Sequence, residues 1–134
     1  MTDDARAESV AEEVALGDAA LRAAEVLASL ALNHDALSRL YFAAFHWARA
    51  LLASAGIEPR THQGVQSLLG LHFVRAGRLE PRFQQTLSRL ETWRGKADYT
   101  RGFVADDALV SRELGEARAL RTRMLELIAL APPA

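Results

Sequence analysis

Apolar residues recur at intervals of three and four along almost the whole chain, which is the spacing of one face of an α-helix. No stretch alternates between apolar and polar residues for long enough to predict a β-sheet. The spacing therefore predicts an all-α protein whose helices cover these segments: residues 5–32, 35–54, 62–75, 81–95 and 106–130. Residues 95–105 are expected to be irregular, because the helical pattern gives out at Gly95.

Capping and helix-breaking residues mark the boundaries between these segments. Asp35 and Thr61 are candidate N-caps, and Pro81 suits the first turn of the fourth helix. The pair Gly17-Asp18 is a candidate kink or break in the first helix. Apolar positions on the helical faces predict a core drawn from four segments: Leu37, Tyr41, Phe45, Leu68, Leu87, Leu90 and Leu120.

The composition limits the classes of protein to consider. A chain of 134 residues suits one domain, which we expect to span residues 1–134. The chain has no cysteine, so disulfides and thiolate metal sites are excluded. No apolar run approaches the ~18–20 residues that cross a bilayer, and the acidic N-terminus is unlike a signal peptide. We therefore expect a cytoplasmic protein that does not enter a membrane.

Charge is unevenly distributed, although the net charge is only −1. Residues 1–35 carry eight acidic residues against two arginines, whereas residues 75–101 carry seven basic residues against three acidic ones. Such asymmetry is typical of a face that binds an anion, but a solvated helix surface gives the same pattern. Of the sixteen basic residues fifteen are arginine, whose planar guanidinium suits a phosphate.

Arg39, Phe42, His46 and Arg49 form a second stripe on the helix predicted over residues 35–54. Their steps of three, four and three place them on one side of that helix. An aromatic ring among cations can stack a base or hold a phosphate. The alternative is that this side packs against a neighbouring helix or a second subunit, because aromatic residues at helical spacing are usually packing residues.

The strongest candidate site is the cluster Arg94, Lys96, Asp98, Tyr99 and Arg101. An arginine can stabilise the charge that develops on a phosphate during phosphodiester cleavage. Asp98 is placed to orient either Arg94 or Tyr99. The alternative is a structural corner, in which Arg94 pairs with Asp98 and Tyr99 packs against a helix.

Other kinds of site find less support in the sequence. The four histidines form no tight pair such as His-x-x-x-His, so we expect no metal site. There is no glycine-rich phosphate loop and no strand-turn-helix setting for a nucleophile.

Three ordered segments resemble a branch of the HEPN family: SRLYFAAFHWARALL at 38–52, THQGVQSL at 61–68 and RGKADY at 94–99. The resemblance covers roughly residues 20–130 and implies a four- to five-helix up-and-down bundle that usually dimerises. It also implies function, because many HEPN proteins are metal-independent endoribonucleases that need no cofactor. They are often toxins paired with a nucleotidyltransferase antitoxin, while other members bind nucleotides or serve as assembly modules.

The ribonuclease motif of the family is an arginine followed four to six residues later by a histidine. Arg94 matches the arginine, but residues 98–100 are Asp, Tyr and Thr, so the histidine is absent. The resemblance therefore assigns catalysis to Arg94, Asp98 and Tyr99, with His46 or His62 brought in from another helix or subunit. Tyr99 is also a loose match to a tyrosine that the partner adenylylates in related pairs.

Two functions of different classes follow. The first is an RNA-directed toxin–antitoxin or defence protein, a homodimeric endoribonuclease with its site at Arg94. The second is a non-catalytic nucleotide- or partner-binding module that works with a nucleotidyltransferase. The absent histidine favours the second, and the arginine-rich segment 75–101 favours the first. Contacts with RNA or a nucleotide are expected at five residues: Arg39, Arg49, His62, Lys96 and Arg101.

Overall fold

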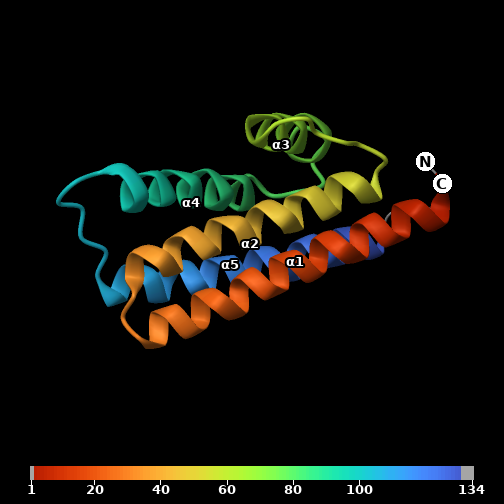
Figure 1. Cartoon of the computed structure of the whole chain (residues 1–134). Helices are drawn as coiled ribbons and strands as arrows, with labels where there is room; N and C mark the ends of the chain where they lie inside the picture. Colours follow the sequence, from red (N-terminus) through yellow and green to blue (C-terminus); the bar gives the residue numbers. More distant parts are fainter. Residues whose placement is uncertain (1, 131–134) are drawn as a thin grey trace.

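The computed structural model describes residues 2–130, and every regular element in that range is helical, as predicted. The elements are α1 (Asp3–Ser29), α2 (Asn33–Ser54), α3 (His62–Leu69), a π-helical turn η1 (Gly70–Val74), α4 (Pro81–Tyr99) and α5 (Asp107–Ala129). Figure 1 shows α2 at the centre of the bundle, with α1 and α5 on one side and α4 and α3 on the other. None of the helices within residues 2–130 is long and apolar enough to cross a membrane.

The central place of α2 follows from its sequence, because 13 of its 22 residues are buried. A helix with a single apolar stripe would bury fewer, so α2 packs on more than one side. Its buried residues include the bulky side chains of Leu37, Tyr41 and Trp47. Along the middle of the helix, the accessible side chains are Arg39 and the partly exposed residues at 42, 46 and 49. The stripe predicted from spacing is therefore the side of α2 that the bundle leaves open.

The predicted core is confirmed at six of seven positions, and Leu68 is the exception. Leu68 is only partly buried, whereas Val65 and Leu69 are fully buried. The face of α3 that meets α2 is thus rotated by about one residue from the predicted face.

The alternative of a break at Gly17-Asp18 is wrong, because α1 continues through both residues to Ser29. Gly17 instead allows a close approach, since a Cβ atom there would lie 2.4 Å from Nε1 of Trp47 on α2. Asp18 then accepts a hydrogen bond from that indole nitrogen at 3.0 Å and a two-pronged bond from Arg121 at 2.7 and 3.0 Å. The pair joins α1 to α2 and α5.

Two predicted helix starts are confirmed and one is wrong. The Thr61 hydroxyl accepts the Gly64 N–H at 2.8 Å, and Pro81 opens α4. Asp35 is not the N-cap of α2, because the helix already begins at Asn33 and Asp35 lies in its first turn. The Asn33 side chain donates to the Ala105 carbonyl at 3.0 Å, and this tether to the α4–α5 connection fixes the earlier start.

The third helix is shorter than predicted, because the α-helical backbone gives way to the π-helical turn at Gly70. The Gln84 side chain from α4 lies against Gly70 and donates to the Gln66 carbonyl at 2.9 Å. The π-helical turn therefore begins where a side chain of α4 meets the backbone of α3.

The fourth helix is longer than predicted, because it passes Gly95 and ends at Tyr99. Glycine inside a helix costs only about 1 kcal/mol relative to alanine. A contact beyond Gly95 offsets this cost, since Asp98 accepts a hydrogen bond from Ser38 of α2 at 2.9 Å. The expectation of irregular structure thus holds only after Tyr99, and Arg94 lies inside a helix instead of at its end.

Candidate functional site

Arg94 lies on the side of α4 that faces α2. Its guanidinium carbon is 5.4 Å from the centre of the Tyr41 ring and 5.0 Å from that of Phe42. Aromatic faces attract cations at this range. Its Nε is shielded from solvent and has no hydrogen-bond partner, while 29% of the side-chain surface stays exposed. Two aromatic rings therefore position Arg94, and the exposed part of its side chain can still donate hydrogen bonds to a ligand.

Asp98 follows Arg94 by one helical turn, and the two side chains form an ion pair. The distance from Arg94 Nε to Asp98 Oδ2 is 3.6 Å, which is too long for a hydrogen bond. The other carboxylate oxygen accepts the Ser38 hydroxyl at 2.9 Å. Asp98 therefore joins α4 to α2, and it only partly engages Arg94. The pairing predicted for a structural corner is present, but it leaves the guanidinium free to bind a second group.

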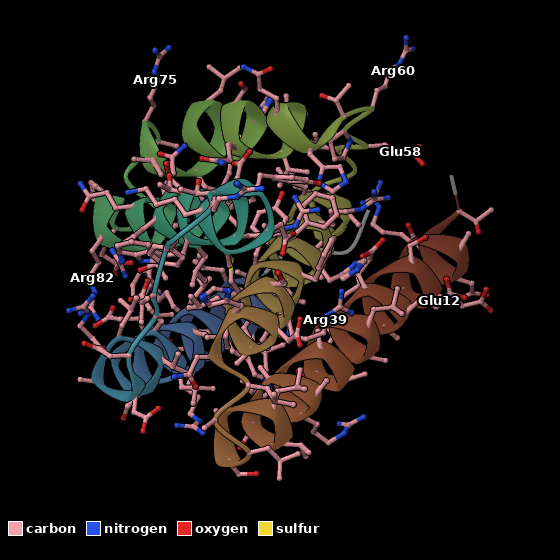
Figure 2. All side chains as sticks on the ribbon, turned by 60° about the vertical axis from the view of Figure 1, so that its left-hand side comes forward. Glu12, Arg39, Glu58, Arg60, Arg75 and Arg82 are labelled. Carbon is pink, nitrogen blue, oxygen red and sulfur yellow. The ribbon has the colours of Figure 1, made fainter. Side chains whose placement is uncertain are left out.

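A shallow, open hollow of about 430 Å³ lies beside Arg94, between α1, α2 and α4. Its lining consists of Leu27, Asp35, Ser38, Arg39, Phe42, Arg94 and Asp98. The Arg39 guanidinium also lies over the Phe42 ring, 4.8 Å from its centre. Figure 2 shows Arg39 on the side of α2 that faces α1. One aromatic ring thus carries two guanidinium groups at the edge of an open hollow, which suits a phosphate flanked by a base.

His62, at the start of α3, lies against the same aromatic group. Its ring stacks on Phe45 with 4.2 Å between centres and 14° between planes. The Tyr41 hydroxyl and His62 Nδ1 share a hydrogen bond of 3.0 Å. Burial, together with the nearby Glu91 carboxylate, raises the pKa of Tyr41 to about 12. Tyr41 therefore stays a neutral phenol, so this contact holds the His62 ring without a second charge.

His46 and Arg49 share the accessible side of α2 but face α1 instead of Arg94. Both bind the Glu13 carboxylate, His46 through Nδ1 at 2.7 Å and Arg49 through Nε at 3.1 Å. The predicted stripe is thus divided: Arg39 and Phe42 lie beside Arg94 of α4, whereas His46 and Arg49 contact Glu13 of α1. Neither His46 nor Arg49 lines the hollow beside Arg94.

Lys96, Tyr99 and Arg101 lie around the end of α4 and do not line the hollow. The Lys96 ammonium is 5.4 Å from the centre of the Trp93 ring. Tyr99 is 79% exposed, so it does not pack against a helix as the structural alternative required. Arg101 is exposed in the turn that follows.

The arginine-rich segment 75–101 does not form one continuous face. Figure 2 shows Arg75 and Arg82 pointing outward, well away from Arg39. Arg89 instead makes a two-pronged bond to Glu113 of α5, whose side chain is fully buried. Of this segment, Arg94 is the basic residue that reaches the hollow.

Within residues 2–130, no three histidine or carboxylate side chains converge as a group that could hold a metal ion. The hollow beside Arg94 instead presents the guanidinium groups of Arg39 and Arg94, which suit an anionic ligand, together with the carboxylates of Asp35 and Asp98.

Sequence reasoning missed three members of this site. Ser38 was not singled out, and Tyr41 and Phe45 were assigned to the core, where they do lie. Their second role, as the surface on which Arg94 and His62 rest, depends on how α3 and α4 pack against α2. The available signal was the position of all three residues inside the segment 38–52, beside the accessible stripe.

The arrangement defines a helical bundle with a site of arginine, carboxylate and aromatic side chains on its central helix. A family model described as the HEPN domain matches residues 16–130, so the chain belongs to the HEPN family. It is 36% identical over 93 residues to a Methanocaldococcus jannaschii protein named Putative toxin MJ0605, a match that covers 69% of each chain.

Two further relatives match shorter stretches. A UPF0332 protein of Pyrococcus horikoshii is 40% identical over 73 residues, which are 54% of this chain and 51% of the relative. A UPF0332 protein of Gloeobacter violaceus is 39% identical over 79 residues, which are 59% of this chain and 63% of the relative.

Proposed function

We propose that this HEPN protein is of the toxin type and binds RNA on the open side of α2, with Arg94 as the phosphate ligand. Two of its relatives, both from Methanocaldococcus jannaschii, carry the name Putative toxin. The observation that carries the proposal is the state of Arg94, whose Nε has no hydrogen-bond partner although the side chain is fixed over two aromatic rings. Nε itself faces the Asp98 carboxylate at 3.6 Å, and the 29% of the side chain that stays exposed beside the hollow offers the donors that a ligand would use.

The RNA binding that we propose uses the two kinds of contact available beside Arg94. Arg94 and Arg39 bind phosphate oxygens, because a guanidinium presents paired donors in the geometry of a phosphate. Phe42 is the partly exposed ring between them, and it supports a neighbouring base by stacking. Asp98 keeps α4 in place through Ser38, so that Arg94 stays over the hollow.

We further propose that the protein cleaves RNA without a metal ion. The test is to incubate the purified protein with total RNA in the presence of EDTA, beside an Arg94→Ala variant of unchanged melting temperature. We expect fragments from the parent and at least a hundredfold slower cleavage by the variant, because one lost transition-state donor costs about 2.7–4 kcal/mol. An intact RNA pool in both samples would contradict the cleavage.

The dimer belongs to the same proposal, and it would form at the end of the bundle that carries Arg94. Val104 is 81% exposed and Leu32 is 47% exposed, and both line a second hollow there, between the α1–α2 turn and the α4–α5 connection. Neighbouring exposed apolar residues that form one patch are typical of interaction surfaces. A twofold contact at this place would bring both copies of Arg94 beside one cleft.

Light scattering tests the dimer. We expect twice the chain mass for the parent at micromolar concentration and the mass of one chain for a Leu32→Glu, Val104→Glu variant. A parent that has the mass of one chain would contradict the dimer. A Leu71→Glu variant is the control, since Leu71 is 52% exposed on η1, away from this hollow.

A second candidate function is favoured by Tyr99. Its side chain is 79% exposed, and no histidine follows Arg94 at positions 98–100. In this alternative the protein binds RNA or a nucleotide without cleaving it, and a partner nucleotidyltransferase modifies the Tyr99 hydroxyl. Mass spectrometry after incubation with ATP and such an enzyme tests it: the parent should gain one adenylyl group and Tyr99→Phe none.

A further inference from the structure

His62 is held in place by two aromatic residues of α2. One face of its ring stacks on Phe45, and its Nδ1 shares a hydrogen bond with the Tyr41 hydroxyl. Its other nitrogen, Nε2, has no hydrogen-bond partner among the described residues, and the residue itself is exposed. The ring is thus fixed in position while one nitrogen stays open to a ligand.

Tyr41 can hold this ring through every step of a proton transfer, because a phenol both donates and accepts hydrogen bonds. When Nε2 carries the proton of neutral imidazole, the phenol donates to Nδ1. When Nε2 is bare, or when both nitrogens are protonated, Nδ1–H donates to the phenol oxygen. The phenol therefore keeps the ring in one position in each of its protonation states.

His62 and Arg94 lie beside the same two aromatic residues, Tyr41 and Phe42. Arg94 approaches the two rings to 5.4 and 5.0 Å, and the His62 ring centre lies 6.2 and 6.5 Å from their centres. These residues come from three different helices, α2, α3 and α4. His62 does not itself line the hollow, but Phe42 does, and it lies between His62 and the hollow's other residues. A phosphate held by Arg94 over Phe42 would place the adjoining ribose at the edge of the hollow nearest His62.

We propose that His62 is the proton-transfer group of the Arg94 site and that Tyr41 is its positioning residue. The inference rests on the proposed cleavage of RNA. His62 Nε2 takes the proton of a ribose 2′-hydroxyl, and the 2′-oxygen attacks the adjacent phosphorus. The bond from phosphorus to the 5′-oxygen breaks, and the 5′-oxygen receives a proton from His62 or from water. The products are a 2′,3′-cyclic phosphate and a 5′-hydroxyl end, so protons and electrons balance.

The experiment compares cleavage and binding in a matched pair of variants, His62→Gln and His72→Gln. His72 is an exposed histidine on η1, away from the aromatic group. Cleavage is followed on an RNA oligonucleotide, and affinity on the same sequence with deoxyribose, which lacks the attacking hydroxyl. We expect His62→Gln to cleave about 10²- to 10⁴-fold more slowly than the parent with unchanged affinity, and His72→Gln to match the parent in both.

Tyr41→Phe gives the second readout. A loss of ring positioning should lower kcat about tenfold or more at unchanged KM, whereas a purely structural role would lower the melting temperature alone. A His62→Gln protein that cleaves as fast as the parent overturns the inference and leaves the function of Arg94 standing. A parent that binds RNA but does not cleave it also overturns the inference, while RNA binding at Arg94 survives. If the parent neither binds nor cleaves RNA, both proposals fall.

Discussion

Gly17 shows how one residue without a side chain sets the contact between two helices. The Trp47 indole occupies the space where a Cβ atom would be, at 2.4 Å from Nε1. Trp47 is fully buried between helices, so its ring has no room to retreat. The close approach also brings the indole N–H onto Asp18, the next residue of α1.

A Gly17→Ala substitution should therefore destabilise the protein by about 1–3 kcal/mol, as is typical when a well-packed core is overfilled. Gly115 of α5 is the control, because no atom lies within 4 Å of a Cβ atom built there. Gly115→Ala should stabilise by about 0.5–1 kcal/mol, the usual gain when alanine replaces a glycine inside a helix. Urea denaturation measures both, and equal effects of the two substitutions would contradict the packing described for Trp47.

Asp18 should contribute to the pH dependence of stability. Its hydrogen bonds from Arg121, and to a lesser extent from Trp47, hold the pKa of this carboxyl below its ordinary value despite partial burial. A carboxyl whose pKa is lower in the folded state stabilises the fold above its unfolded pKa of about 3.9, and this contribution is lost as pH falls through the folded pKa.

Asp18→Asn should accordingly be less stable than the parent at pH 7, and the two proteins should converge as the pH falls toward 2. The free energy of unfolding in urea, measured across this range, gives the comparison. A constant difference between the two curves at all pH values would show that the Asp18 charge is not linked to folding.

At the scale of the elements, the continuation of α4 past Gly95 to Tyr99 determines how the candidate site is built. Because α4 continues to Tyr99, Arg94 and Asp98 are one turn apart on the same face. An irregular segment would instead have let Arg94 and Asp98 move independently.

A Gly95→Ala variant tests the continuous helix. No atom lies within 4 Å of a Cβ atom built at Gly95, so alanine should stabilise the protein by about 0.5–1 kcal/mol. Gly77→Ala is the contrast, because Gly77 has a φ of 73° that alanine adopts only with strain. A loss of stability at Gly95 as large as that at Gly77 would mean that the segment is not helical.

Local sequence signals predicted most of the elements, and they were wrong where a distant residue intervenes. Thr61 and Pro81 mark helix starts by chemistry that acts within one turn, and both predictions are confirmed. The early start of α2 depends on Asn33 and Ala105, and the π-helical turn depends on Gly70 and Gln84. Such contacts join segments that only the folded chain brings together.

At the scale of the whole molecule, the candidate site exists because α2 is buried on all but one side. The sequence predicted that side from the spacing of Arg39, Phe42, His46 and Arg49. It did not predict that Arg39 would share Phe42 with Arg94 while His46 and Arg49 turn to Glu13 of α1. The division depends on the packing of α1 and α4 against α2, which helical periodicity does not encode.

Most of the arginine-rich segment lies outside the proposed RNA site. Net charge over residues 75–101 suggested one cationic face, yet Arg89 is committed to Glu113, and Arg75 points away from α2. Exposed charges far from the bound phosphate contribute little at physiological salt, because the Debye length is about 8 Å. Binding should therefore depend on position along the bundle and not on the number of arginines.

The central claim is that RNA binds at Arg94. It is tested most directly by the affinity of an RNA oligonucleotide for two variants, Arg94→Ala and Arg75→Ala. Fluorescence anisotropy measures this affinity over a range of salt concentrations. A lost hydrogen bond between a guanidinium and a phosphate is worth about 1.5–3 kcal/mol, so Arg94→Ala should bind at least about tenfold more weakly than the parent. The salt dependence should fall by about 0.7, the value for one single-strand phosphate contact. Arg75→Ala removes the same charge from the outward face and should match the parent in both quantities. Equal losses in the two variants, or none in Arg94→Ala, would contradict the assignment of the RNA site to Arg94.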